Sequence, residues 1–139
     1  MEPIILTYEV NGDDFSVAGE ASSAVKKYLK KMGFPPDLIR RVSIAMYEGE
    51  INMVIHADGG TATAEIYQEG VKIVLADKGP GIKDIDLAMQ EGYSTAPDEV
   101  RNLGFGAGMG LPNIKKYSDD LQIETELGVG TTLTISIHI

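Results

Sequence analysis

The sequence predicts an α+β fold of two layers, in which helices pack on a β-sheet. The chain of 139 residues is long enough for one domain, and its 43% hydrophobic content can fill a sizeable core. The expected elements run in the order strand, two helices, hairpin, glycine-rich connection and closing hairpin. Because strands do not alternate strictly with helices, this order disfavours a doubly wound parallel sheet.

The N-terminal half is predicted to contain one strand and two helices. Residues 4–10 form the strand, and a turn follows in which Asp13 or Asp14 can cap the first helix. Apolar residues then recur at helical spacing, and Gly33 ends this helix. A second apolar series supports a helix over residues 38–57.

The C-terminal half is predicted to contain two hairpins, with strands at residues 61–68, 71–77, 121–126 and 131–139. The first hairpin turns at residues 69–70, and the second turns around residues 128–130. Residues 80–103, between the hairpins, are irregular except for a short helix near residues 85–90. A further helix is expected over residues 111–117.

Composition excludes several classes of protein. The net charge is −9 without a basic stripe, so tight binding to DNA or RNA is not expected. There is no cysteine, which excludes a disulfide scaffold, a thiolate zinc site and a cysteine nucleophile. No apolar run approaches the ~18 residues of a membrane span, and the acidic N-terminus is unlike a signal peptide. We therefore expect a cytoplasmic protein without a membrane partner.

The first motif with chemical potential lies on the second predicted helix. Glu48, Asn52 and His56 are spaced four residues apart and share one helix face, whereas Glu50 points elsewhere. The surrounding run is apolar, so a carboxylate and an amide here need partners. Mg²⁺ prefers such oxygen ligands. The alternative is an exposed polar stripe. Gly49, which costs a helix about 1 kcal/mol relative to alanine, hints at close packing.

The second motif begins where an apolar strand ends in Asp77, followed by Gly79 and Gly81. A carboxylate at this position can accept a hydrogen bond from an exocyclic amine such as that of adenine. The two glycines let the backbone approach a flat ligand closely. A simple turn would explain the glycines but not the acid at the end of the strand.

The third motif is a run of alternating glycines, Gly104, Gly106, Gly108 and Gly110, that leads into a helix at Leu111. Backbone amides in such a loop, together with a helix N-terminus, bind phosphate. A flexible loop is the alternative. The P-loop is excluded because the chain has no Gly-Lys dipeptide, and neither the dinucleotide fingerprint nor the protein-kinase signatures are present.

The fourth motif consists of Gly130, Thr131 and Thr132 at the start of the last strand. It is explained by a hairpin turn and a half-buried strand. The alternative is a threonine hydroxyl, or a water bound to it, that reaches the base of a nucleotide.

In this order, the four motifs resemble those of the GHKL ATPase superfamily. Glu48 and Asn52 resemble its N-box, and Asp77 begins its Asp-x-Gly-x-Gly box. Residues 104–111 resemble its second glycine box and ATP lid, and residues 130–132 its closing Gly-Thr-Thr. The resemblance implies a Bergerat-type ATP-binding fold, with a mixed sheet and helices on one face. Residues 1–139 would form a single histidine-kinase-like ATPase domain.

Among these ATPases, the chain most resembles the bacterial anti-sigma-factor serine kinases of the stressosome switch type. The length, residues 88–96 and the short lid ending at residues 108–112 support this resemblance. It implies an ATP- and Mg²⁺-dependent serine/threonine kinase that acts on a STAS-type antagonist and controls transcription by partner switching. The alternative is an ATP-gated module that binds a sigma factor or another protein without phosphotransfer. A homodimer is left open.

The resemblance also implies roles for individual residues. Glu48 would be the general base, Asn52 would ligate Mg²⁺, and Asp77 would accept from the adenine amine. The remaining nucleotide-binding positions would be Gly79, Gly81, Gly104, Gly106, Gly108, Gly110, Leu111 and Thr131. Arg101 is the candidate near the lid for the γ-phosphate. Neither His56 nor His138 lies on a dimerisation helix, so autophosphorylation on histidine is not expected.

Overall fold

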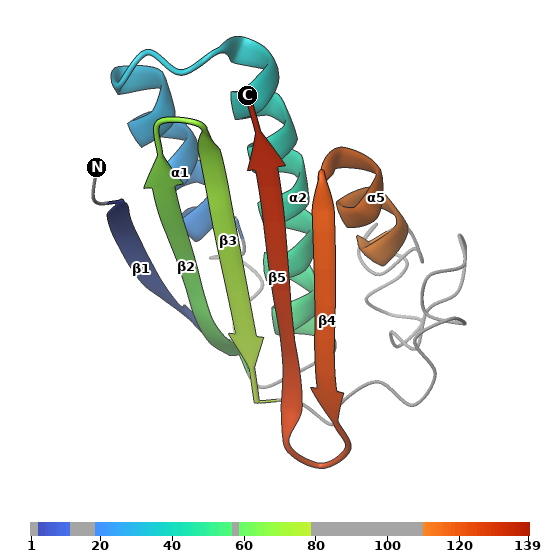
Figure 1. The fold of residues 1–139 in the computed structure, drawn as a ribbon. Coiled ribbons are helices and arrows are strands. Elements are labelled where there is room, and N and C mark those ends of the chain that lie inside the picture. Colours follow the sequence, from blue (N-terminus) through green and yellow to red (C-terminus); the bar gives the residue numbers. More distant parts are fainter. Residues whose placement is uncertain (1–2, 12–18, 57–58, 79–109) are drawn as a thin grey trace, which may run out of the picture.

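In the described parts of the chain, a five-stranded sheet carries three helices on one of its faces (Figure 1). The computed structural model describes residues 3–11, 19–56, 59–78 and 110–139. The elements are β1 (Ile4–Asn11), α1 (Glu20–Lys31), α2 (Pro36–His56), β2 (Gly59–Tyr67), β3 (Gly70–Asp77), α5 (Gly110–Tyr117), β4 (Asp120–Glu126) and β5 (Gly130–His138). The predicted two-layer α+β architecture is confirmed. The expected short helix near residues 85–90 lies outside the described residues.

The strands lie in the order β1-β2-β3-β5-β4, and all four neighbouring pairs are antiparallel. The expectation of a mixed sheet is therefore wrong for the described strands. Two of the pairs are hairpins, whose strands must run in opposite directions. Between β1 and β2, α1 and α2 run up and down the sheet, so β2 begins where β1 ends and Asn11 pairs with Gly59 (Figure 1).

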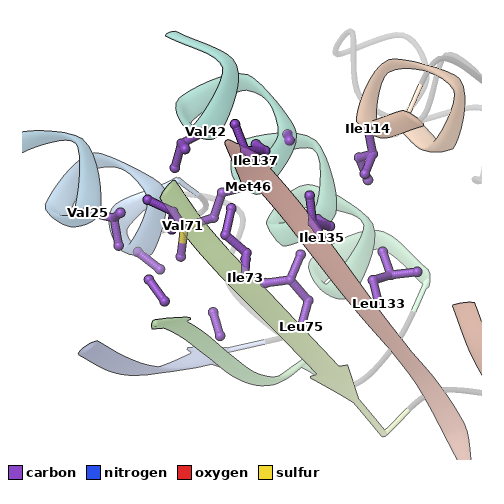
Figure 2. Packing of buried hydrophobic residues seen from close by; sticks show 14 of the residues in the cluster. Val25, Val42, Met46, Val71, Ile73, Leu75, Ile114, Leu133, Ile135 and Ile137 are labelled. Carbon is purple, nitrogen blue, oxygen red and sulfur yellow. The ribbon is translucent and has the colours of Figure 1, made fainter. Parts of the chain in front are cut away.

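The core lies between the sheet and the helices. Alternate side chains of β3 and β5 are buried. Figure 2 shows four of them, Ile73, Leu75, Ile135 and Ile137, pointing toward the helical layer. Helix α2 packs against β1, β2, β3 and β5. A Cβ atom at Gly49 would overlap Leu75 Cδ1, so the absent side chain lets α2 approach β3 closely. None of the described helices is long and apolar enough to cross a membrane.

An arginine-centred cluster closes one end of the molecule. Arg41, on α2, donates from Nε to Asp37 (2.9 Å), from Nη1 to Asp119 (3.1 Å) and from Nη2 to the carbonyl of His138 (2.6 Å). The backbone N–H of His138 donates to the same Asp119 carboxylate at 2.6 Å. This cluster joins the first turns of α2 to the start of β4 and the end of β5.

The pKa of Asp119 is lowered from its ordinary value of 3.8, chiefly by the hydrogen bond from the His138 backbone. Partial desolvation opposes this effect, and Arg41 adds to it. Because the folded-state pKa lies below the unfolded one, the stabilisation is fully present above the unfolded value. It is lost as the pH falls through the folded value.

We expect Asp119→Asn to lower the free energy of unfolding by about 1 kcal/mol at neutral pH, a modest value because the pair is partly exposed. The difference from wild type should shrink as the pH falls below 3.8, where Asp119 protonates in the unfolded chain, and it should disappear below the lower folded-state pKa. Urea unfolding across the acid range measures this difference. A difference that stays constant with pH would contradict the assignment. Asp37→Asn, which removes a more exposed acceptor of the same Arg41, should cause a smaller loss.

Candidate functional site

The motif on α2 lies at the end of the sheet where β3 ends and β5 begins (Figure 1). Glu48 and Asn52 are half-buried, and their neighbours Ile51 and Met53 are buried. Glu48 Oε1 accepts a hydrogen bond from Asn113 Nδ2 on α5 at 3.4 Å. The polar face is therefore not a freely exposed stripe, because it is partly covered by a neighbouring helix.

Glu48 also borders a groove between α1 and α2. Other side chains that line this groove include Lys26 and Lys27 from α1 and Ser43 and Tyr47 from α2. A ligand or protein segment in this groove would therefore lie beside Glu48.

Asp77 is held in place by the first residues of β5. Its Oδ1 atom accepts a hydrogen bond from the backbone N–H of Thr131 at 2.9 Å. A Cβ atom at Gly130, whose φ is +152°, would overlap the Asp77 carbonyl oxygen and lie 3.3 Å from Oδ1. The Thr131 and Thr125 hydroxyl oxygens are 2.9 Å apart. The carboxylate thus has a defined orientation at the end of the strand, which a simple turn does not require.

Two of the motifs meet at Gly60 on β2. A Cβ atom added at Gly60 would lie 2.8 Å from Asp77 Cα and 2.9 Å from the Met53 methyl group. The residue that follows Asn52 thus packs beside Asp77. Leu111, in the first turn of α5, is buried in the same core. The end of α2, the end of β3 and the start of β5 therefore lie at one end of the sheet.

Several predicted nucleotide-binding residues lie outside the described parts of the chain, namely Gly79, Gly81, Gly104, Gly106, Gly108 and the candidate Arg101. Gly110 is the first residue of α5. In the described segments, no three acidic or histidine side chains cluster as a metal site. A divalent cation here would take most of its ligands from phosphate and water, as Mg²⁺ usually does.

The contacts of Glu50 were not predicted from the sequence. This carboxylate is only 2% exposed and accepts backbone N–H bonds from Gly19, Ala21 and Ser22 at 2.9, 3.1 and 3.0 Å. Its burial within an apolar run was the available signal, because a buried carboxylate needs donors. The role of Asn113 beside Glu48 had no such signal.

The predicted N-cap of the first helix was wrong. The N-cap residue of α1 is Gly19, which has no side chain to accept a hydrogen bond from the helix amides. Asp13 and Asp14 lie upstream of this position, outside the described residues. The amides of the first turn are instead satisfied by Glu50, a carboxylate distant in sequence, which no local capping pattern could reveal.

Comparison with known proteins identifies the family. Residues 14–137 match the histidine kinase-like ATPase domain. The chain belongs to the histidine kinase-like ATPase domain family. This assignment covers all four motifs, and it agrees with the resemblance drawn from them.

Two relatives of this ATPase domain have informative names. The serine/threonine-protein kinase RsbT of Bacillus subtilis (strain 168) is 32% identical over 108 residues, which cover 75% of each chain. An anti-sigma F factor of Clostridium beijerinckii is 33% identical over 121 residues, covering 83% of this chain and 81% of the relative. Relatives of this domain thus include both a kinase and an anti-sigma factor.

Solved structures share the fold. The SiaB-SiaC complex from Pseudomonas aeruginosa matches with a TM-score of 0.64 at 16% identity, covering 98% of this chain and 90% of that chain. The RsbU and RsbW domains of Rv1364c from Mycobacterium tuberculosis also match with a TM-score of 0.64 at 16% identity. There the match covers 97% of this chain and 32% of the other, longer chain.

The contact between Gly130 and Asp77 predicts an asymmetry between two neighbouring glycines. Gly130→Ala should lower the free energy of unfolding by about 3 kcal/mol, because the new methyl group strains the backbone and displaces Asp77. Gly128→Ala is the matched control: φ is +80° and nothing lies within 4 Å, so only about 1 kcal/mol of backbone strain is expected.

Urea unfolding measures both losses. The NMR chemical shift of the Thr131 amide proton should change in Gly130→Ala and remain at its wild-type value in Gly128→Ala. Equal losses of stability, or an unmoved Thr131 amide in Gly130→Ala, would contradict the proposed fixation of Asp77.

Proposed function

We propose that this domain binds ATP with Mg²⁺ and phosphorylates a serine or threonine of a STAS-type antagonist protein, and so controls transcription by partner switching. The observation that carries the proposal is the placement of Glu48 and Asn52 one helical turn apart, at the same end of the sheet as the oriented carboxylate of Asp77. The family assignment and the relative named as a serine/threonine-protein kinase support it.

The described residues fit a Mg-nucleotide in their chemistry. Asp77 offers a carboxylate that Thr131 holds at the end of a strand, which suits the recognition of an exocyclic amine. Asn52 offers an amide oxygen, a ligand that Mg²⁺ accepts, and the first turn of α5 would contribute backbone amides near Gly110 and Leu111. Bound Mg-ATP supplies the phosphoryl group, together with a metal charge that neutralises it.

Glu48 is suited to the role of general base. It lies one turn before Asn52 and lines the groove between α1 and α2, through which a partner's hydroxyl would approach it. The N–H of Asn113 restricts the orientation of the carboxylate through the bond to Oε1. In this proposal Glu48 takes the proton of the partner's hydroxyl, which requires that the two oxygens come within hydrogen-bond distance.

An alternative function is ATP-gated binding of a sigma factor or another protein without phosphotransfer. The relatives named anti-sigma F factor, including one at 33% identity, favour it. The same nucleotide site would serve both functions. The kinase proposal goes further only in giving Glu48 a chemical role.

Calorimetric titration with Mg-ATP tests the nucleotide site. We expect Asn52→Ala and Asp77→Asn each to weaken binding by about 10- to 100-fold, the value of one hydrogen bond or ligand contact to a charged or polarised group. Asp119→Asn provides the matched control, because it makes the same chemical change in the cluster around Arg41. Wild-type affinity in both site variants would refute the assigned pocket.

Phosphotransfer is tested with radiolabelled Mg-ATP and a STAS-domain antagonist protein from the same organism. Label should appear on serine or threonine of the antagonist, and Glu48→Gln should slow this transfer at least about 100-fold while nucleotide affinity changes little. Normal transfer by Glu48→Gln would exclude Glu48 as the base. Nucleotide-dependent binding of the antagonist without any label would instead support the binding module.

A further inference from the structure

The buried carboxylate of Glu50 connects α1 and α2. Its Oε2 atom accepts from the N–H groups of Gly19 and Ala21, and its Oε1 atom accepts from that of Ser22. These donors lie at the N-terminus of α1, where unpaired amides and the helix dipole both favour a negative charge. The interaction therefore replaces the missing local cap of α1 with a residue of α2.

Glu50 belongs to the part of α2 that carries the proposed general base and the proposed Mg²⁺ ligand. It stands two residues after Glu48 and two residues before Asn52, on a different side of the helix. On its other sides, this turn contacts Leu75 of β3 at Gly49 and Asn113 of α5 through Glu48. Glu50 attaches this turn to α1 through three hydrogen bonds. By comparison, Asn113 contributes one hydrogen bond and Leu75 contributes packing.

We propose that Glu50 is a positioning residue for the nucleotide site, which acts by locking the first turn of α1 to the turn of α2 that holds Glu48 and Asn52. The proposal rests on the proposed function of that turn, and Glu50 itself need not touch the nucleotide. Its consequence is that a disturbance at the start of α1 is transmitted to Asn52.

Two variants disturb this interaction from opposite sides. In Glu50→Gln an NH₂ group replaces one carboxylate oxygen, so at least one of the three backbone donors faces another donor and the negative charge is lost. Gly19→Ala leaves Glu50 intact. It strains a backbone with φ +95° and brings a methyl group within 2.9 Å of the Tyr47 ring, which shifts the Gly19 amide.

Gly33→Ala is the matched control for Gly19→Ala. Gly33 lies at the opposite end of α1 and has φ +80°, so alanine meets a comparable backbone strain there. Nothing lies within 4 Å of its added methyl group. This variant therefore destabilises α1 without acting on the bonds to Glu50.

The first measurement is hydrogen exchange of the backbone amides in α2, which NMR detects in the protein without nucleotide. Exchange at Glu48 and Asn52 should accelerate about tenfold in Glu50→Gln and in Gly19→Ala, and should change less than about twofold in Gly33→Ala. The second measurement is the Kd for Mg-ATP, which should rise about tenfold in the first two variants only, because small displacements of a site residue weaken binding.

The outcomes separate this proposal from the proposed function. If the wild-type protein fails to bind Mg-ATP, the nucleotide site is wrong, and the exchange experiment alone decides whether Glu50 positions this turn. If Glu50→Gln does not fold, the comparison of Gly19→Ala with Gly33→Ala decides. Exchange at Asn52 that responds equally to Gly19→Ala and Gly33→Ala would overturn the positioning role.

Discussion

A largely buried helix must provide a hydrogen-bond partner for each of its buried polar groups. This constraint determines how α2 packs near the candidate site. Helix α2 meets it with two carboxylates that serve different neighbours. Glu50 binds the amides of α1, and Glu48 meets Asn113 of α5. Between them, Gly49 removes the side chain that would separate α2 from Leu75. One turn of helix is thereby fixed against a strand and two other helices.

The antiparallel topology brings the remaining pieces to this turn. Because β3 and β5 are adjacent and opposed, the residue that ends β3 lies beside the residues that begin β5. Asp77 consequently receives the Thr131 amide across 54 positions of sequence. The cluster around Arg41 performs a separate task, since it ties the first turns of α2 to the end of β5. The convergence of Asn52 and Asp77 on one nucleotide stays a prediction.

Much of this fold could be predicted from the sequence because helical spacing and strand alternation report directly on the core, as in β5, where every second residue is buried. Strand direction could not be read this way, so the antiparallel sheet differed from the expected mixed one. The residue types of the N-box and the strand-end acid were recognisable locally. The partners of Glu50 and Asn113 were not recognisable, because they lie on α1 and α2, elements distant in sequence.

A crystal structure with Mg²⁺ and a non-hydrolysable ATP analogue tests the central claim most directly, since it locates the nucleotide relative to all the motifs at once. The account predicts that the adenine amine meets the Asp77 carboxylate, and that Mg²⁺ is coordinated by the Asn52 amide oxygen and the phosphates. A nucleotide bound elsewhere, or a complex in which Asn52 and Asp77 face different surfaces, would contradict it.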